Sequence, residues 1–329
     1  MTATKTLAMT VAAPGGPEAL QPTEIALATP GPGEALIRQS YAGVNYVDVY
    51  YRSGLYPLPA YPAALGVEGA GVITAIGEGV AGLKVGDRVA YVGHPLGAYA
   101  TERLVPASRL VRLPEAIEPR TAAAAMARGL TAHLLLHKVA MLRPGDWVLV
   151  HAAAGGVGQL VTRWARRLGL RVVGTVGSSG KAEIASAAGA EAVFLHSDPG
   201  WVEAARRVAD GKGAQLAIDG IGGETFARTL GAMRSFGVVA SIGQAAGPIA
   251  PIAIESLGFP RAIAVARPSV LAYANDPELY REGAEALFAA LIDGLTVSVG
   301  AEYPLRDAAR AHADLEAGRT TGSLLLAMP

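Results

Sequence analysis

The sequence contains no cysteine among its 329 residues. This absence excludes disulfides, thiolate nucleophiles, cysteine-based zinc sites and iron–sulfur clusters. Only 17% of the residues are charged, and 28 basic residues balance 28 acidic ones. Such a balance argues against a main role in binding nucleic acid or an anionic membrane, which favours excess positive charge. The sequence also lacks the run of about 18 apolar residues that a membrane-spanning helix needs. Because a chain without disulfides is typical of the reducing cytoplasm, we expect a soluble, cytoplasmic protein.

The first third of the chain has the pattern of short strands separated by turns. Leu7–Ala13 is apolar, too short for a signal peptide, and runs into a Pro-Gly-Gly-Pro turn, so it predicts a first strand. Alternating or β-branched runs follow at Ala35–Arg38, Gly71–Ile76 and Arg88–Val92. Regular short strands with glycine and proline between them predict a β-barrel-like unit up to about residue 113.

From about residue 121 to residue 261, apolar strands alternate with helical stretches. The predicted strands are Trp147–His151, Arg171–Val176, Ala192–Leu195, Gln215–Asp219 and Val238–Ile242. The predicted helices between them are Gly158–Gly169, Lys181–Gly189, Pro199–Asp210 and Glu224–Ser235. This alternation predicts a doubly wound parallel sheet covered by helices on both faces.

The C-terminal segment returns to a mixed pattern that could complete the first unit. It has a helical stretch at Pro277–Asp293, a strand, a second helical stretch at Leu305–Gly318 and a final strand at Ser323–Ala327. We therefore predict an α/β protein with a β-rich domain at 1–125, completed by 268–329, and a Rossmann domain at 126–267.

A glycine-rich turn follows the first strand of the predicted parallel sheet. The residues Ala153-Ala154-Gly155-Gly156-Val157-Gly158 match the dinucleotide fingerprint G-x-G-x-x-G, with Ala153 in place of the first glycine. Gly155 permits close approach of the backbone to a pyrophosphate, and Gly158 permits close packing of helix on strand. The start of the helix offers unpaired N–H groups to the phosphates. Because the required strand and helix flank the motif, it predicts dinucleotide binding rather than a purely structural turn.

The end of the next strand predicts which dinucleotide is bound. An NAD-dependent enzyme would place a carboxylate here to bind the ribose 2′-hydroxyl. This chain instead has Gly177-Ser178-Ser179-Gly180-Lys181, with no acid before Glu183. Hydroxyls and a lysine suit a 2′-phosphate, so NADPH is the predicted cofactor. The alternative is that Ser178 and Lys181 only cap and solvate the following helix.

At this point the sequence resembles a known family. The stretches that carry the resemblance are residues 42–57, 65–80, 86–91, 128–133, 152–158, 267–269 and 303–312. In this order they resemble the medium-chain dehydrogenase/reductase superfamily, and within it the zinc-free quinone oxidoreductases of the zeta-crystallin-like branch. The resemblance implies a GroES-like catalytic domain beside a Rossmann domain, an NADPH-dependent quinone reductase, and a homodimer formed through Rossmann sheet edges.

The resemblance also gives the missing cysteine a meaning. Zinc-containing members of the superfamily carry a cysteine near Asn45 and a Gly-His-Glu motif where this chain has Gly66-Val67-Glu68. Valine cannot bind zinc, so we expect hydride transfer without a metal, which suits a quinone better than an alcohol. His133 and His137 could share a helix face, but they lack a third ligand and are better explained by packing.

The stretch from Asn45 to Tyr56 is dense in groups that could meet negative charge on a substrate oxygen. Asn45 and Asp48 are three residues apart and would lie on one side of a helical turn. Tyr50 and Tyr56 add phenols and Arg52 adds a cation. The residues alone fit a capped turn with packed tyrosines equally well. By resemblance, Asn45, Asp48, Tyr50 and Tyr56 line the nicotinamide and quinone pocket, with Asn45 and Tyr50 orienting or polarising the reactants and Asp48 supporting them.

Cofactor-binding positions are carried over from the same resemblance. They are Asn45, Thr131, Ala153, Gly155, Gly156, Val157, Gly158, Gly177, Ser178, Lys181, His196, Ile242, Gly243 and Arg267. His196 stands where relatives often have a tyrosine, and a role as a surface histidine is an equal alternative. Arg319 lies about one place from an arginine that some relatives use.

Two alternatives to the quinone reductase remain open at the sequence level. The same fold and cofactor could reduce α,β-unsaturated aldehydes, ketones or enoyl thioesters. A non-enzymatic nucleotide- or RNA-binding role is the other, against which the zero net charge argues. For the dimer, Ala262–Ala266 is the apolar segment that could be an uncovered edge strand, the alternative being an internal strand.

Overall fold

The computed structural model describes residues 5–329, and their contacts divide them into two units. The first unit combines the residues up to Ala127 with Tyr273–Pro329, and the second unit is Arg128–Ala272. Helices α2 (Pro119–Leu134) and α7 (Val270–Asn275) each contain one of the two division points. This division is made by contacts alone. The functional domains expected at 1–125 with 268–329 and at 126–267 therefore remain predictions.

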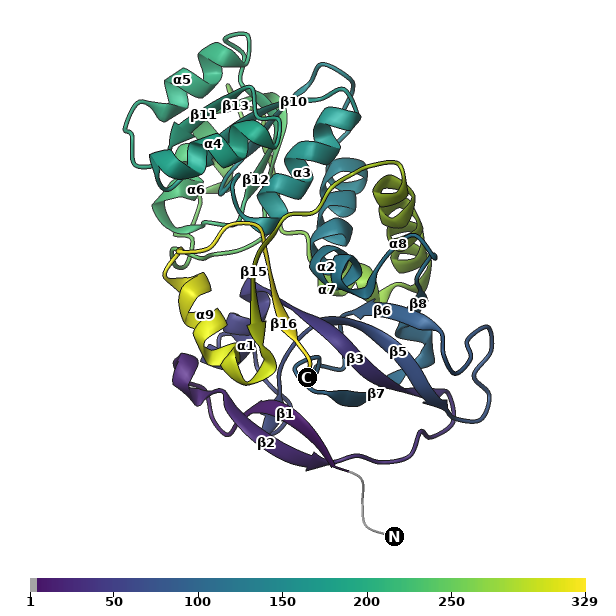
Figure 1. Cartoon of the computed structure of the whole chain (residues 1–329). Coiled ribbons are helices and arrows are strands. Elements are labelled where there is room, and N and C mark those ends of the chain that lie inside the picture. The colour runs from purple at the N-terminus through teal and green to yellow at the C-terminus, as the bar shows by residue number, and fades with distance from the viewer. Residues whose placement is uncertain (1–4) are drawn as a thin grey trace. The chain divides into compact units, whose positions relative to one another are not determined.

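Two sheets form the framework of the first unit (Figure 1). A three-stranded sheet has the order β2-β1-β4, and a seven-stranded sheet has the order β15-β16-β3-β5-β6-β8, with β7 paired to β3. The strands are β1 Lys5–Val11, β2 Gln21–Ala26, β3 Glu34–Val44, β4 Ala63–Ala64, β5 Glu68–Ile76, β6 Arg88–Val92, β7 Glu102–Pro106, β8 Val111–Arg112, β15 Val299–Pro304 and β16 Ser323–Ala327. The expected β-barrel-like unit is therefore two separate sheets.

The C-terminal segment completes the larger sheet of the first unit. Strand β16 pairs antiparallel with β3, with Leu324 opposite Val44 and Ala327 opposite Tyr41. The helices of this unit are η1 Pro17–Ala19, α1 Tyr46–Ser53, η2 Ala107–Arg109, α8 Pro277–Ile292, η5 Leu305–Asp307 and α9 Ala308–Glu316. The 11-residue strand β3 ends directly before α1, so the sheet fixes where that helix begins.

The second unit is a six-stranded parallel sheet with the order β11-β10-β9-β12-β13-β14 (Figure 1). Its strands are β9 Trp147–Val150, β10 Arg171–Val176, β11 Ala192–Leu195, β12 Ala214–Asp219, β13 Met233–Ser241 and β14 Ala264–Ala266. Its helices are α3 Gly156–Arg167, α4 Ser179–Ala187, α5 Trp201–Val208, α6 Gly223–Gly231, η3 Leu135–Val139 and η4 Ile254–Leu257. This strand order is that of a Rossmann fold, so the predicted fold class is confirmed.

The prediction for α6 was wrong at its C-terminal end. The helical pattern was expected to continue to Ser235, but the helix ends at Gly231 and strand β13 begins at Met233. The apolar side chains of Phe226, Leu230 and Met233 all belong to one buried core cluster. Because helix and strand both present apolar residues to that core, the sequence pattern alone hides the change from one to the other.

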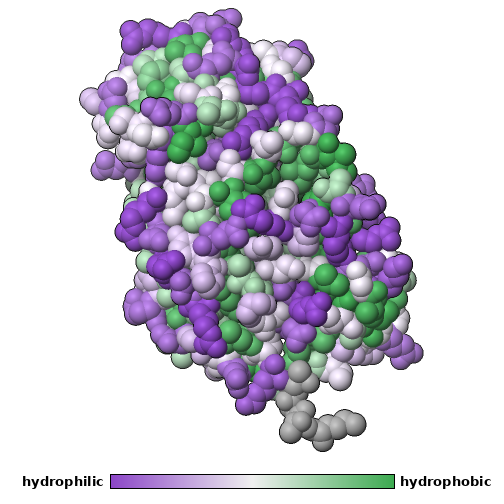
Figure 2. Space-filling model, in the orientation of Figure 1, coloured by the Kyte–Doolittle hydropathy of each residue, from purple (hydrophilic) through white to green (hydrophobic). Residues whose placement is uncertain are grey.

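The helices agree with the expectation that no segment spans a membrane. Within residues 5–329 no helix is both long enough and apolar enough to cross a membrane. On the face drawn in Figure 2, hydrophilic and hydrophobic residues are interspersed.

Candidate active site

Asn45 and Asp48 are joined at the start of α1. Asn45 is the residue before the helix, and its backbone N–H donates to Oδ2 of Asp48 at 2.8 Å. The bond satisfies one of the amides that a helix start leaves unpaired. Asp48 is fully buried. The structure thus brings the two predicted residues together, with the Asp48 carboxylate buried beneath the start of the helix.

Glu68 is a site residue that the sequence analysis left without a role. It is fully buried at the start of β5, and its Oε1 accepts from Nδ2 of Asn45 at 2.7 Å. Its Oε2 accepts from the backbone N–H of Ala127 at 2.6 Å. A Cβ on Gly43 would lie 2.0 Å from Glu68 Oε1, so only glycine fits beside this carboxylate. The signal in the sequence was Gly66-Val67-Glu68, where Glu68 follows the valine that replaces a zinc ligand.

Tyrosines of α1 pack against one another and, edge to face, against Tyr56 just after the helix. The ring centroids of Tyr50 and Tyr56 are 5.3 Å apart, and those of Tyr46 and Tyr50 are 5.6 Å apart. The hydroxyl of Tyr51 lies 3.0 Å from Nε2 of His94. Burial raises the pKa of Tyr46 and of Tyr51, so both phenols stay protonated at neutral pH. The structure brings Tyr50 and Tyr56 together.

Arg52 does not supply the cation that was expected in this stretch. Its side chain is buried, and Nη1 and Nη2 donate to the two carboxylate oxygens of Glu316 at 2.7 and 2.8 Å. Its Nε donates to the carbonyl oxygen of Gly15 at 3.1 Å. Since the guanidinium is committed to these partners, the prediction of a cation facing the substrate was wrong.

In the second unit, the glycine-rich turn leads from the end of β9 into the start of α3. Ala152 adopts a left-handed backbone with φ +49°, which a residue with a side chain rarely takes. Gly155 precedes α3, so the first turn of that helix has no side-chain cap. A Cβ on Gly158 would lie 2.4 Å from the carbonyl oxygen of Ala152 and 2.7 Å from Cα of Ala153. No side chain fits at Gly158 without moving this turn, which agrees with the close packing expected there.

The residues predicted to meet the 2′-phosphate follow strand β10. A Cβ on Gly177 would lie 3.3 Å from the ring of His196, so these two residues are neighbours. Ser178 stands before α4, and its side chain makes no capping hydrogen bond with the described residues. Lys181 lies in the first turn of α4. The alternative in which Ser178 serves as a helix cap is therefore not supported.

The ends of β12 and β13 bring together three further predicted residues. Nη1 of Arg267 donates to Oγ of Ser241 at 2.5 Å and lies 3.4 Å from the carbonyl oxygen of Gly243. The backbone N–H of Ile242 donates to the carbonyl oxygen of Asp219 at 2.7 Å. Because parallel strands end at one edge of the sheet, this group and the glycine-rich turn share the carboxyl edge, where Rossmann folds bind ligands. Thr131, the remaining cofactor candidate, lies on α2.

These residues fit a phosphorylated dinucleotide. The start of α3 has no side-chain cap, so its first backbone N–H groups are available as donors to phosphate. No carboxylate occupies the first turn of α4. The carboxylate of Asp219, at the end of β12, has a structural role: its Oδ1 accepts from the backbone N–H groups of Ile221 and Gly222. Burial raises the pKa of Asp219.

The described residues do not fit a catalytic metal. Val67 is buried where a zinc ligand would stand, and the chain has no cysteine. The rings of His133 and His137 lie 4.7 Å apart and both are 6.0 Å from the ring of Trp164. Residues 5–329 contain no group of three or more His, Cys, Asp or Glu that could hold a metal ion. We therefore derive no step through a metal.

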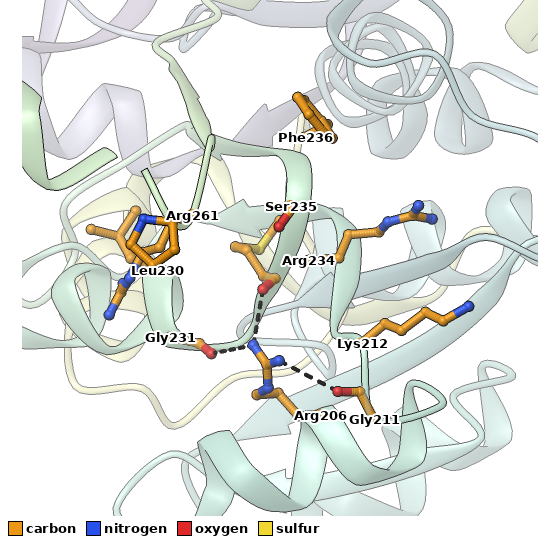
Figure 3. A pocket seen from close by; sticks show the side chains of 11 residues that line it. Arg206, Gly211, Lys212, Leu230, Gly231, Arg234, Ser235, Phe236 and Arg261 are labelled. Carbon is orange, nitrogen blue, oxygen red and sulfur yellow. Dashed lines mark hydrogen bonds between the residues drawn. The ribbon is translucent and has the colours of Figure 1, made fainter. Parts of the chain in front are cut away.

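A cavity of about 630 Å³ lies at the other edge of the second unit's sheet (Figure 3). Basic side chains on its lining are Arg206, Lys212, Arg234 and Arg261. Nη1 of Arg206 donates to the carbonyl oxygens of Gly231 and Met233 at 3.2 and 3.1 Å, and Nη1 of Arg234 lies 3.8 Å from Asp146. Because Met233 is the first residue of β13, this cavity is at the amino edge, and the predicted site residues are not among those that line it.

The prediction for Arg319 gains no support. Arg319 donates to Oδ1 of Asp314 from Nε at 2.9 Å and from Nη2 at 2.5 Å. The pair lies at and beyond the end of α9 and links the helix to the segment that follows it.

Comparisons with known proteins place the chain in a family. A family model described as "Alcohol dehydrogenase GroES-like domain" matches residues 31–115, and one described as "Zinc-binding dehydrogenase" matches residues 156–274. A quinone oxidoreductase of Pseudomonas aeruginosa is 40% identical over 96% of this chain and 97% of its own length. A 2-haloacrylate reductase of a Burkholderia species is 38% identical over 95% of this chain and 96% of its own length.

A solved structure agrees with the sequence comparisons. The crystal structure of Escherichia coli quinone oxidoreductase complexed with NADPH superposes with a TM-score of 0.94 at 37% identity. The match covers 98% of this chain and 99% of that one. With both units matched over their length, the chain belongs to the quinone oxidoreductase family of the medium-chain dehydrogenase/reductase superfamily.

Proposed function

We propose that the chain catalyses the NADPH-dependent reduction of quinones without a metal. The observation that carries the proposal is the match over nearly the whole chain to a quinone oxidoreductase solved with NADPH. The glycine-rich turn, the uncapped start of α3 and the absence of a carboxylate after β10 support it independently.

The second unit is the proposed cofactor-binding part. The turn Ala153–Gly158 would hold the pyrophosphate, and Ser178 and Lys181 would bind the 2′-phosphate, with His196 beside Gly177. Thr131, Ile242, Gly243 and Arg267 would complete the binding surface. When bound, NADPH supplies the hydride for the reduction.

The first unit is the proposed source of the groups that act on the quinone. Hydride addition to a quinone leaves negative charge on an oxygen, and donors aimed at that charge lower the barrier. Asn45 and Tyr50 are the donors that we assign to this role, with Tyr56 beside Tyr50. Asp48 holds the backbone N–H of Asn45 and Glu68 holds its side-chain amide, so Asn45 is oriented before substrate arrives.

Reduction of α,β-unsaturated carbonyls is the second candidate function. It is favoured by the 2-haloacrylate reductase, which is 38% identical to this chain over 95% of its length. Both reactions deliver a hydride and leave charge on a distant oxygen, so the same donors would serve. The loops 57–64 and 248–260 are the segments that we expect to select between the substrates.

Steady-state oxidation of NADPH across a panel of acceptors tests the proposal. The panel contains benzoquinone, a naphthoquinone, 2-alkenals, 2-haloacrylate and an enoyl thioester, each measured with NADPH and with NADH. We expect the highest kcat/KM for a quinone with NADPH. A higher value for an enone would select the second function, and salt-dependent binding of an RNA pool without turnover of any acceptor would reject both.

We further propose a cytoplasmic homodimer with a small molecule as its main partner. Strand β14 lies at the end of the six-stranded sheet, and Val265 on it is 40% exposed. An uncovered edge strand with an apolar residue favours pairing with a second copy. Size-exclusion chromatography with light scattering should give the mass of a dimer, and Val265→Lys should shift it toward the monomer. A monomeric wild-type chain would reject the dimer.

A further inference from the structure

A continuous chain of hydrogen bonds in the first unit connects the C-terminal helix α9 to the start of α1. Helices α1 and α9 contact each other (Figure 1). Nη1 of Arg52 lies 3.2 Å from Nδ1 of His312, and Nε2 of His312 lies 3.1 Å from the hydroxyl of Tyr99. That hydroxyl donates to Oδ2 of Asp48 at 2.9 Å, the same oxygen that accepts from Asn45. Residues far apart in sequence thus meet at one carboxylate.

The direction of each bond in this chain follows from its first member. An arginine side chain is always protonated and can only donate, so Nδ1 of His312 must accept. The proton of the neutral imidazole therefore sits on Nε2 and is donated to the hydroxyl of Tyr99. With its oxygen accepting from His312, the Tyr99 hydroxyl directs its own proton to Asp48.

Burial keeps the direction of these hydrogen bonds fixed. Burial and the charge of Arg52 lower the pKa of His312 to about 3, so the ring stays neutral at physiological pH. The side chains of Asp48, Tyr99 and His312 are all fully buried. A buried polar group that loses its hydrogen-bond partner destabilises the fold, so the arrangement resists change. The charge of Arg52 is matched by Glu316, which is half-buried and closes the chain at its outer end.

We propose that Tyr99 and His312 are positioning residues for the quinone-reduction site. They act on Asp48, and Asp48 holds the backbone N–H of Asn45 and thereby sets where the Asn45 side chain lies. The inference rests on the proposed function, because it assigns these residues to the same site. Its physical content is that the hydroxyl proton of Tyr99 is needed by Asp48, and not merely the bulk of its ring.

A double-mutant cycle tests the inference. Tyr99→Phe keeps the ring and removes the hydroxyl, and we expect it to lower kcat for a quinone about tenfold while the KM for NADPH changes by less than about twofold. In an Asn45→Ala background the same substitution should lower kcat by less than about twofold, because its effect passes through Asn45. An equal loss of kcat in both backgrounds would overturn the inference.

The matched control is Tyr303→Phe. Tyr303 is a buried tyrosine of the same unit whose hydroxyl donates to Oδ2 of Asp314, also at 2.9 Å, and the other oxygen of that carboxylate accepts from Arg319. Its loss should lower the melting temperature without changing kcat. A fall in kcat equal to that of Tyr99→Phe would show that any lost tyrosine–aspartate bond has this effect, and would overturn the proposal.

Two variants at His312 test the order of donors. His312→Gln retains an acceptor for Arg52 and a donor for Tyr99 and should keep most of the activity, whereas His312→Ala should resemble Tyr99→Phe. Equal loss in both variants would contradict the assigned direction.

Hydrogen exchange separates the inference from the proposed function. The Asn45 amide should exchange faster in Tyr99→Phe than in the wild type or in Tyr303→Phe, whether or not a quinone is reduced. If this exchange changes but the wild type reduces no quinone, only the proposed function fails. If quinones are reduced but neither this exchange nor the coupling to Asn45 is seen, only the inference fails.

Discussion

The two proposed sites are built from different parts of the chain, one in each unit. The second unit uses backbone: Gly155 and Gly158 shape a turn, and the start of α3 provides the donors within one short segment. The first unit uses side chains from distant segments, since Asn45 is held by Asp48 and Glu68, and Asp48 by Tyr99. A local backbone site can be predicted from a short motif, whereas a side-chain network exists only after the chain has folded.

Two buried histidines show the same contrast. His151 in the second unit lies between the hydroxyls of Thr175 and Thr229, at 2.7 and 2.8 Å. His312 in the first unit lies between the cation Arg52 and the hydroxyl of Tyr99. Burial lowers the pKa of each to about 3, so both are neutral. Equal burial therefore does not imply an equal role: the partners of His151 tie strands and a helix together, whereas those of His312 lead to Asp48.

The largest effect is expected from a side chain at Gly158. In Gly158→Val the Cβ would meet the backbone of Ala152 and Ala153 at 2.4 and 2.7 Å, and Ala152 already has a left-handed φ. We expect the Kd for NADPH to rise by up to about 150-fold, since strain of this kind costs up to about 3 kcal/mol per residue. Fluorescence titration with NADPH measures it. Gly200→Ala is the control, because a Cβ there has only an ordinary contact of 3.4 Å. An unchanged Kd for NADPH in Gly158→Val would contradict the proposal that the backbone of the glycine-rich turn binds the cofactor.

The next largest effect is expected from the donors of the first unit. Asn45→Ala and Tyr50→Phe should each lower kcat/KM for a quinone about 100-fold, the typical loss on removing one donor to a developing oxyanion. Glu68→Gln keeps the size of the side chain but weakens its hold on the Asn45 amide, so a smaller loss is expected. Steady-state kinetics with a quinone measure all three. Wild-type kcat/KM in both Asn45→Ala and Tyr50→Phe would remove their assigned role.

A moderate effect is expected at the end of β10. Lys181→Ala and Ser178→Ala should each reduce the preference for NADPH over NADH by about tenfold, because each removes a bond to a charged phosphate. The KM for the quinone should stay the same, because the groups that we assign to the quinone lie in the first unit. The ratio of kcat/KM for NADPH to that for NADH measures the change. An unaltered ratio in both variants would leave the 2′-phosphate to other residues.

The smallest effect on activity is expected for His312→Gln, which acts instead on the pH dependence of the free energy of unfolding. His312 has a pKa of about 3 in the folded chain against an ordinary value of 6.5, so below pH 6.5 the unfolded chain binds a proton that the folded chain does not. Its contribution to folding free energy is thus retained above pH 6.5 and decreases by about 1.4 kcal/mol per pH unit as the pH falls toward the folded pKa. His312→Gln lacks this proton uptake and should lose less stability than the wild type between pH 6.5 and about pH 5.

Denaturant unfolding at several pH values checks the last prediction. His151→Gln is the matched variant in the second unit, because the pKa of His151 is also about 3. Both substitutions should flatten the pH dependence of the free energy of unfolding while leaving most of the quinone turnover in place. If the free energy of unfolding varied with pH equally in the wild type and both variants, the claim that the two buried histidines are neutral would be contradicted.

The sequence predicted the second unit better than the first because its signals are local. Strands β10 and β11 and the glycine-rich turn lie where the pattern predicted them, since each is a short segment with its own periodicity. The role of Glu68 was missed, as were those of Tyr99 and His312, since their partners lie 23 to 213 positions away in the sequence. Arg52 was assigned wrongly for the same reason: its partner Glu316 is 264 positions away.

The most direct test of the division between the units is a matrix of four reactions. The kcat/KM is measured for NADPH or NADH with a naphthoquinone or a 2-alkenal, in the wild type, Lys181→Ala and Tyr50→Phe. We predict that Lys181→Ala changes only the NADPH-to-NADH ratio and that Tyr50→Phe changes only the values for the acceptors, leaving that ratio intact. A change of the NADPH-to-NADH ratio in Tyr50→Phe as large as that in Lys181→Ala would contradict the account.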